Sequence, residues 1–242
     1  MLASAQRTPA SNVVVRSGFD WRAADAYLFD IDGTLLNSRD AVHYFAFHTA
    51  IESVWKTKQR IDDVPVHGNT DIGILRAVAE RAGVDEQTFT SSLPRICELM
   101  SSEVERNHAD LRPQLCEAIP ELIAELHAQG KILGVATGNL EAIGWAKLRA
   151  CGLRHYFHFG AFSAPDRERR AAVFRYGVER AREVKGEDAI VYAVGDTPSD
   201  IAAAREVGIP IISVATGNYS FEELHALAPD MIVRCCEHLP RP

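Results

Sequence analysis

Five short apolar runs, none of which alternates apolar with polar residues, constrain the fold of this 242-residue chain more than any other feature. They cover residues 26–29, 131–136, 189–194, 211–214 and 231–233. Continuous apolar runs of this length are typical of strands that are covered on both faces. Amphipathic helical patterns separate the later runs. This order predicts an α/β fold, a doubly wound (Rossmann-like) parallel sheet with right-handed crossovers.

Turn and capping residues mark where these helices begin and end. Pro120 precedes a helical pattern over residues 121–129, and a glycine follows it. Two further patterns, 140–151 and 198–207, also stop at a glycine. The Ser-Phe-Glu-Glu run at 220–223 is a capping box that predicts one last helix.

Residues 41–112 break this rhythm, because helical patterns follow one another there with no strong strand candidate. Patterns over 41–55 and 71–82 have apolar residues at helical spacing, and Pro94 is expected to open a third helix. We predict an all-α helical-bundle cap domain inserted after the first strand, with Trp55 and the phenylalanines in its core. The predicted parts are a flexible N-terminal arm (1–20), an α/β core (21–40 and 113–242) and the cap (41–112).

Two aspartates, Asp30 and Asp32, follow the first apolar run. Side chains at i and i+2 lie on the same side of an extended strand, so both carboxylates can face one point. Paired carboxylates repel one another, and hard oxygen ligands at this density favour Mg²⁺. Gly33 permits a sharp turn, and Thr34 adds a hydroxyl and a backbone N–H beside the carboxylates, so both are candidate phosphate-binding residues.

A second acidic strand end occurs at 195–200, where the sequence is Gly-Asp-Thr-Pro-Ser-Asp. Asp196 stands at the tip of the predicted strand, and Asp200 lies near the first turn of the next helix. Open α/β sheets bind their ligands at the carboxyl ends of the strands. The two acidic strand ends together therefore predict a hard-cation site.

A third strand end, Thr137-Gly138-Asn139, predicts a phosphate cradle. It offers a hydroxyl, a flexible glycine and the N-terminus of a following helix. The phrase nearly recurs at 216–218, which is a lesser candidate for the rim of the site because no helix follows it directly.

Composition limits the classes of partner. The net charge of −7 and the pI near 5.7 argue against a nucleic-acid surface, and no apolar stretch approaches the length of a membrane span. The five cysteines are scattered without a CxxC spacing, which favours reduced thiols in a cytoplasmic protein. Residues 1–20 lack the apolar core of a signal peptide. The sequence does not indicate an oligomeric state.

The three strand-end motifs, in the order 30–34, 137–139 and 195–200 along the chain, resemble those of the haloacid dehalogenase (HAD) superfamily. The likeness is greatest to its phosphoglycolate-phosphatase-like hydrolases with an inserted α-helical cap. The resemblance extends from about Ala24 to the end of the chain. It implies a Mg²⁺-dependent phosphatase that acts on a small phosphorylated metabolite.

The resemblance also implies a role for each aspartate. Asp30 would be the nucleophile and Asp32 the general acid/base, while Thr137 would hold the transferring phosphoryl group. Asp196, with the carboxylate of Asp30 and the backbone carbonyl of Asp32, would bind Mg²⁺, and Asp200 would support the site. The pKa of Asp32 is expected to be raised by neighbouring carboxylates and partial burial, because this residue must protonate the leaving alkoxide.

The chain departs from the family pattern in one element. The family usually has a lysine between the Thr137 and Asp196 motifs, early in a helix, whereas residues 160–173 contain three arginines and no lysine. The pattern resembles a variant in which arginine takes this role, and it points to Arg169 as a phosphate-binding, catalytic residue. Arginine suits such a role because it is permanently charged and can grip phosphate with two hydrogen bonds. Lys147, the rival, is expected on a solvated helix face.

Other activities remain as alternatives. If the protein is an enzyme, the alternative activity is that of a phosphoglucomutase-like phosphoryl transferase. If it is not an enzyme, the alternative is a non-catalytic phospho-ligand sensor on the same scaffold. A dehalogenase is disfavoured because Asp32 would have no leaving-group oxygen to protonate. Phosphonate hydrolysis would need a cap lysine for a Schiff base, and Lys56 and Lys58 lie in a polar stretch.

The polar segment 67–71 between two predicted cap helices is the candidate for substrate selection. It resembles the substrate-specificity loop of capped family members, which faces the catalytic strand ends. We expect Asn69 to contact the substrate and Thr70 to cap the helix that begins at Asp71.

Overall fold

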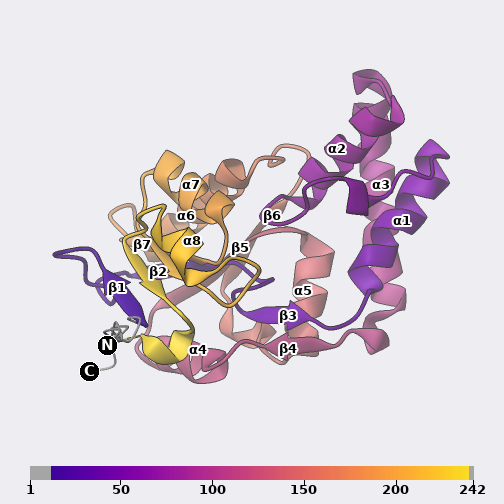
Figure 1. The fold of residues 1–242 in the computed structure, drawn as a ribbon. Coiled ribbons are helices and arrows are strands. Elements are labelled where there is room, and N and C mark those ends of the chain that lie inside the picture. The colour runs from indigo at the N-terminus through magenta and orange to yellow at the C-terminus, as the bar shows by residue number, and fades with distance from the viewer. Residues whose placement is uncertain (1–11, 240–242) are drawn as a thin grey trace, which may run out of the picture.

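The structure, a computed structural model, describes residues 12–239. Seven strands form one sheet in the order β1–β9–β8–β7–β2–β5–β6, and all neighbours are parallel except β1 and β9 (Figure 1). The strands are β1 (Val13–Val15), β2 (Ala26–Phe29), β5 (Ile132–Leu140), β6 (Phe159–Ser163), β7 (Val191–Gly195), β8 (Ile211–Val214) and β9 (Met231–Val233). The doubly wound α/β fold is therefore confirmed.

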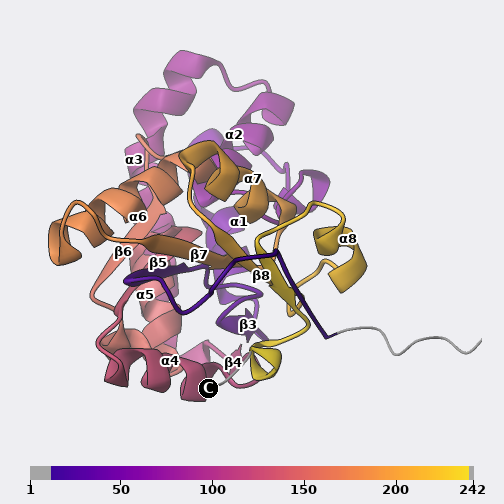
Figure 2. The same cartoon turned by 90° about the vertical axis from the view of Figure 1, so that its left-hand side faces the viewer.

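Helices cover both faces of this sheet (Figure 2). Tyr27 and Phe29 of β2 belong to a core cluster that includes Leu122 of α4, whereas Leu28 belongs to a second cluster that includes Phe174 of α6. Successive side chains of a strand point to opposite faces, which explains why this apolar run does not alternate. The helices of the core are α4 (Ile119–Ala128), α5 (Glu141–Ala150), α6 (Arg170–Lys185), α7 (Pro198–Val207) and α8 (Phe221–His225), with short 3-10 turns η3 (Arg154–Tyr156) and η4 (Cys236–His238).

All five predicted strands are present, but β1 and β6 were not predicted. Val13–Val15 forms β1, so this part of the predicted flexible arm is an ordered edge strand paired with Met231–Val233. Residues 1–11 of that arm lie outside the described residues. β6 was missed because its sequence, Phe-Gly-Ala-Phe-Ser, is short and interrupted by glycine.

Three helices form the segment between β3 and β4, at the right of Figure 1. Their shared cluster of buried apolar residues also contains Leu140, Ile143 and Ala146, so the helical segment packs directly on α5. The strands β3 and β4 pair antiparallel where the chain leaves and re-enters the core. The elements are β3 (Leu36–Ser38), α1 (Val42–Trp55), η1 (Ile61–Asp63), α2 (Asp71–Ala82), α3 (Glu86–Arg106), η2 (His108–Asp110) and β4 (Pro113–Leu115).

Two predictions for the cap were wrong. Pro94 lies inside α3 rather than at its start, because Asp85 caps the helix and accepts a hydrogen bond from the Thr88 N–H at 2.9 Å. Phe45 is 58% exposed, whereas Phe47 is buried. Trp55 is half-buried against the cap cluster.

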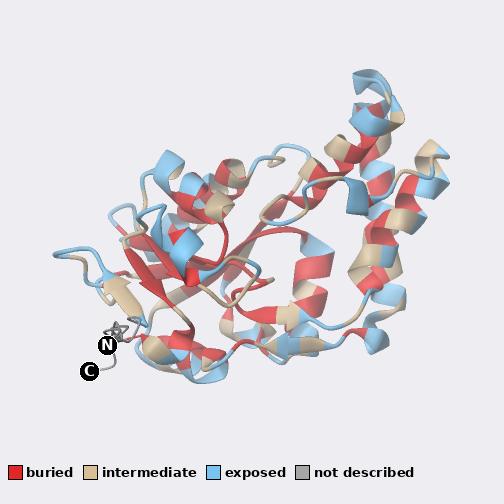
Figure 3. Cartoon of the chain, in the orientation of Figure 1, coloured by how far each residue is buried: buried red, intermediate tan, exposed pale blue. Residues whose placement is uncertain are grey.

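Buried and exposed residues lie in different parts of the molecule (Figure 3). Apart from the edge strand β1, the strands of the sheet are buried along most of their length, while the far ends of the cap helices are exposed. Among residues 12–239, no helix is both long enough and apolar enough to cross a membrane.

Candidate active site

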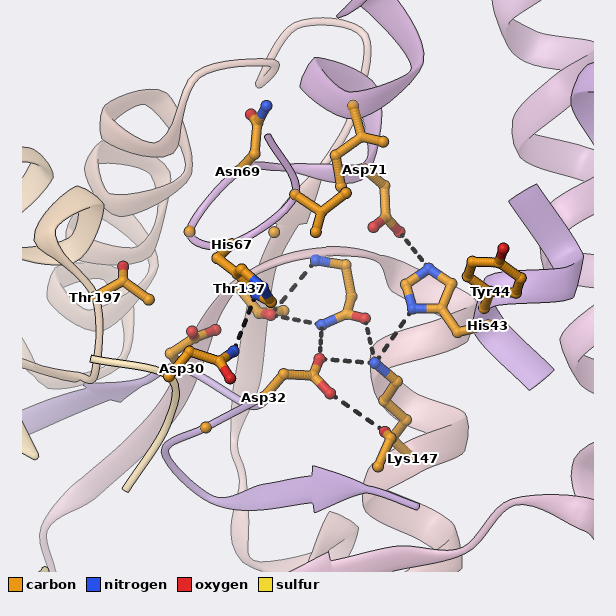
Figure 4. A pocket seen from close by; sticks show the side chains of 18 of the residues that line it. Asp30, Asp32, His43, Tyr44, His67, Asn69, Asp71, Thr137, Lys147 and Thr197 are labelled. Carbon is orange, nitrogen blue, oxygen red and sulfur yellow. Dashed lines mark hydrogen bonds and ion pairs between the residues drawn. The ribbon is translucent and has the colours of Figure 1, made fainter. Parts of the chain in front are cut away.

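The carboxyl ends of β2, β5 and β7 meet beneath the cap at a cavity of about 330 Å³. Core residues from all three predicted motifs line the cavity, including Asp30, Thr137 and Asp196. Residues of the cap and of the loop at 66–69 close the opposite side (Figure 4). The structure therefore brings the three motifs together at one place, as the parallel sheet requires.

Three buried carboxylates, those of Asp30, Asp196 and Asp200, have oxygens within 4.8 Å of one another. Burial, partly offset by Arg170, raises the pKa of Asp30 to about 6. Burial and the nearby charge of Asp30 raise the pKa of Asp196 to about 8. Carboxylates so close together with raised pKa values in the metal-free state fit a divalent cation, which would replace their protons.

The turn after β2 supports this carboxylate group. Gly33 has φ +88°, and a Cβ at that position would overlap the carboxylate of Asp196. Thr34 is fully buried, and its hydroxyl donates to Asp196 Oδ1 at 2.9 Å. In this state Thr34 orients a carboxylate, so its hydroxyl is not free for the phosphate contact predicted for it.

Both carboxylate oxygens of Asp200 accept hydrogen bonds, one from the start of its own helix and the other from an arginine. Its Oδ2 accepts hydrogen bonds from the N–H and hydroxyl of Thr197 at 3.0 and 2.7 Å, which forms the capping box of α7. Its Oδ1 accepts from Nε of Arg170 at 2.8 Å. These bonds fit the supporting role expected of Asp200.

The arginine at the site is Arg170, not Arg169. Arg170 is only 8% exposed, and its Nη2 lies 2.7 Å from Asp30 Oδ2 and 2.6 Å from Asp200 Oδ1. Arg169 is 75% exposed and pairs with Glu206 on α7. The physical reason is the start of α6: Arg169 is its N-cap residue with an extended backbone, and Arg170 is its first helical residue. The sequence pattern was therefore off by one position.

The carboxylate of Asp32 turns to a different set of partners. Its Oδ2 lies 2.7 Å from Lys147 Nζ and accepts a hydrogen bond from Asn139 Nδ2 at 2.8 Å (Figure 4). Burial acts to raise the pKa of Asp32, but the charge and hydrogen bond of Lys147, with Asn139 and His43, outweigh it and lower the pKa. The expectation of a raised pKa was therefore wrong. The side chain is also outside the carboxylate group of Asp30, so Asp32 has only its backbone carbonyl to offer a metal there.

Lys147 lies at the site, although the sequence predicted it on a solvated helix face. It is 3% exposed, and its Nζ lies 2.8 Å from Asn139 Oδ1 and 3.3 Å from His43 Nδ1. His43 in turn pairs with Asp71 at 3.2 Å, and Asp71 also accepts from the Leu140 N–H. A continuous polar chain thus joins the predicted acid/base to cap helices α1 and α2.

The predicted phosphate cradle lies within a strand rather than at a helix start. β5 continues through Thr137, Gly138 and Asn139 to Leu140, and α5 begins at Glu141. The Asn139 side chain donates to the hydroxyl of Thr137 at 2.8 Å as well as to Asp32. Thr137 and Gly138 both line the cavity, so they remain candidates for phosphate contact without the help of a helix N-terminus.

The cap loop at 67–71 lies over the catalytic strand ends. A Cβ on Gly138 would overlap the backbone carbonyl of Asn69, and a Cβ on Gly68 would press on Ser199. Thr70 caps α2 by accepting from the Gly73 N–H at 3.0 Å, as predicted, and it also donates to the Glu168 carbonyl. The close approach at both glycines means that the loop is seated on the core in this structure.

Asn69 lines the cavity but also stabilises its own loop. Its side chain donates to the Pro65 carbonyl at 3.3 Å and accepts from the Thr70 N–H at 2.8 Å. The repeated phrase at 216–218 reaches the same rim. Its Thr216 hydroxyl donates to the Gly33 carbonyl, and a Cβ on Gly217 would overlap Asp196.

Comparison with known proteins gives a consistent family. The model of the haloacid dehalogenase-like hydrolase family matches residues 27–214. A phosphoglycolate phosphatase from Synechococcus elongatus is 28% identical over 210 residues, which cover 86% of this chain and 92% of that protein. A probable phosphatase, IndB, from Dickeya dadantii is 29% identical over 220 residues, with 85% and 87% covered.

Solved structures show the same fold. A haloacid dehalogenase-like hydrolase from Bacteroides fragilis superposes with a TM-score of 0.66 at 19% identity, covering 90% of this chain and all of that one. A predicted phosphoglycolate phosphatase from Haemophilus somnus gives 0.61 at 20% identity, with 89% and 96% covered. The resemblance noted in the sequence is confirmed: the chain belongs to the haloacid dehalogenase-like hydrolase family, as a hydrolase similar to phosphoglycolate phosphatases.

Proposed function

We propose that the protein is a Mg²⁺-dependent phosphatase that hydrolyses a small phosphate monoester through an aspartyl-phosphate intermediate. One observation supports this most: the buried carboxylate of Asp30 lies between a permanent cation, Arg170, and a second carboxylate, Asp196, at the floor of the cavity. A phosphate dianion entering this acidic site needs neutralising charge on both sides.

Asp30 and Asp196 would hold the metal, with Asp200 beside them. When bound, Mg²⁺ would neutralise phosphate charge and orient the ester. A carboxylate oxygen of Asp30 attacks phosphorus in line, and the bond from phosphorus to the leaving alkoxide breaks. Arg170 is close enough to Asp30 to hold both the nucleophile and a phosphate oxygen, and Thr137 is placed to donate from its hydroxyl.

Asp32 would handle the protons of both half-reactions. It gives a proton to the departing alkoxide and later takes one from the water that attacks the aspartyl phosphate. The pair with Lys147 favours the ionised form of Asp32, which suits the second half-reaction. Departure of a poor alkoxide, which needs the protonated form, is therefore the step that we expect to be more demanding.

The proposal is tested by phosphate release from p-nitrophenyl phosphate with and without Mg²⁺. Asp30→Asn should abolish turnover, at least a thousandfold, because the amide cannot serve as the nucleophile. Asp63→Asn, an exposed cap residue, is the matched control. Protein quenched during turnover should carry phosphate on Asp30. Phosphate on another residue, or more than a tenth of the rate in Asp30→Asn, would refute the assignment.

The same assay separates the alternatives. A phosphoryl transferase would pass phosphate to an added sugar phosphate faster than to water, and a sensor would bind without release. A cytoplasmic location and a small phosphorylated metabolite as partner belong to this proposal, as do the cap boundaries at 41 and 112. The names of the relatives make phosphoglycolate the first compound to test.

A further inference from the structure

We propose that the leaving group which this cavity accepts is an uncharged alcohol with an apolar portion, and not one that carries a carboxylate or a second phosphate. The proposal rests on the phosphatase function above and adds the substrate class. It follows from what lines the cap side of the cavity and from how each cation near it is already engaged.

Four apolar side chains line the cap side of the cavity, beside polar ones such as Tyr44 and Asn69. Phe47 of α1, Ile61 of η1, Val66 of the cap loop and Ile74 of α2 all line it. These side chains come from separate parts of the cap, so the apolar surface is a feature of the assembled cavity and not of one helix. An apolar surface of this kind favours a leaving group with apolar carbon atoms, since their contact removes the apolar surfaces of the protein and of the leaving group from water.

No permanent cation is free on this side. Among the described residues that line the cavity, the only lysine and arginine are Lys147 and Arg170. Arg170 is held by Asp30 and Asp200, and it faces the phosphate end. Lys147 is buried and held by Asp32 and by Asn139.

Neither histidine of the lining is a buried side chain that is free for a second anionic group. His43 is engaged through both ring nitrogens, by Asp71 at 3.2 Å and by Lys147 at 3.3 Å. His67 is exposed at the rim, where its Nδ1 lies 3.0 Å from Asn218 Nδ2. A second anionic group bound deep in the cavity would therefore lose water without gaining a free cation, which is unfavourable.

Carboxylates on the same side add repulsion. Asp40 and Asp71 both line the cavity beyond the catalytic group. Asp40 accepts from the backbone N–H groups of Val42 and Arg112, so it fixes the start of the cap and has no cationic side chain against it in those bonds. A negative leaving group would approach these charges in a partly buried space, where screening by water is weak.

Two esters that differ in one group test the proposal. 2-Phosphoglycolate and 2-hydroxyethyl phosphate have the same length, but the first carries a carboxylate where the second carries a neutral CH₂OH. With Mg²⁺ present, we expect kcat/KM for the hydroxyethyl ester to be at least tenfold higher, and n-butyl phosphate to be better still. An equal or higher kcat/KM for phosphoglycolate would overturn the substrate class while leaving the phosphatase function intact. Absence of Mg²⁺-dependent hydrolysis of every ester, p-nitrophenyl phosphate included, would overturn both.

A matched pair of variants checks the location. Val66→Lys places a cation in the apolar surface, while Val64→Lys makes the same change at a half-buried residue of the same segment that does not line the cavity. Val66→Lys should shift the ratio of kcat/KM between the two esters at least fivefold toward phosphoglycolate, and Val64→Lys should leave the ratio unchanged. If both variants retain the wild-type melting temperature and the wild-type ratio, the cap surface does not select the leaving group.

Discussion

The two sides of the cavity are built in opposite ways. The core side is made of buried charges, Asp30, Asp196, Asp200 and Arg170, which are fixed by strand ends and by the first turns of two helices. The cap side combines four apolar side chains with polar residues that are mostly paired, such as His43, Asp71 and Asn69. The sheet therefore positions the charged groups that act on phosphate, while the inserted helices shape the space around the leaving group.

The polar chain from Asp32 through Lys147 and His43 to Asp71 is where the two sides meet. Substitutions on the core side should therefore affect all substrates alike, and substitutions on the cap side should affect them unequally. Substitutions in the connecting chain should change how the acid/base titrates.

After the nucleophile Asp30, the largest effect is expected from Arg170. Arg170→Ala should lower kcat/KM by about ten- to a hundredfold or more for every ester, because a charged hydrogen bond to phosphate is worth ~1.5–3 kcal/mol and more when desolvated. Arg169→Ala removes an exposed pair with Glu206 and should change kcat/KM less than twofold. Steady-state kinetics on two esters and thermal melts measure both.

Arg170→Lys should restore part of the rate by keeping the charge. Comparable small losses from Arg169→Ala and Arg170→Ala would mean that Arg170 does not contact phosphate. A loss confined to one ester would contradict the division between the two sides.

An intermediate effect is expected from Lys147. Lys147→Met should raise the pKa of Asp32, since Lys147 is the main group that lowers it against the effect of burial. A higher pKa keeps Asp32 protonated to higher pH, which favours departure of the alkoxide, so the alkaline limb of the pH–rate profile for an alkyl ester should move upward. The exposed Lys185→Met is the control. An unmoved alkaline limb would show that Asp32 is not the group observed in that limb.

A smaller effect is expected in how much Mg²⁺ raises the melting temperature at different pH values. Asp30 and Asp196 have raised pKa values, about 6 and about 8, so they stabilise the metal-free fold at low pH and lose this contribution as pH rises through those values. Mg²⁺ should therefore increase the melting temperature more at pH 8.5 than at pH 5.5, where it must displace protons. Asp196→Asn should remove most of the increase. An equal increase at both pH values would contradict a metal held by these carboxylates.

The smallest effects separate two neighbours in the cap loop. Thr70→Ala removes the cap of α2 and should cost ~0.5–2 kcal/mol of stability while affecting all esters alike. Asn69→Ala should change the ratio of kcat/KM between two esters of different size by a few fold. Thermal melts and kinetics on the same preparations measure both. Unchanged ratios in Asn69→Ala would remove this side chain from substrate selection.

Much of the architecture could be predicted because it depends on local signals. The strands at 26–29 and 211–214 are continuous apolar runs, and α2 and α7 begin at capping residues and end at glycines. Pro94 misled the prediction because the buried residues of α3, such as Leu93, Ile96 and Met100, keep that helix continuous through the proline. Local preference gave way to packing there.

The candidate site also has features that could be predicted from local sequence and others that depend on packing. The meeting of Asp30, Asp196 and Asp200 could be predicted from the sequence, because the carboxyl ends of parallel strands lie at one edge of such a sheet, whereas the turn of the Asp32 carboxylate toward Lys147 could not. Which cation meets which carboxylate depends on the tertiary structure. Arg169 is the N-cap residue of α6 with an extended backbone and Arg170 is its first helical residue, so the Arg170 side chain points inward while Arg169 stays in solvent. Lys147 is buried for a similar reason: Asp32, Asn139 and His43 of cap helix α1 surround its Nζ, whereas local sequence alone would leave that helix face in water.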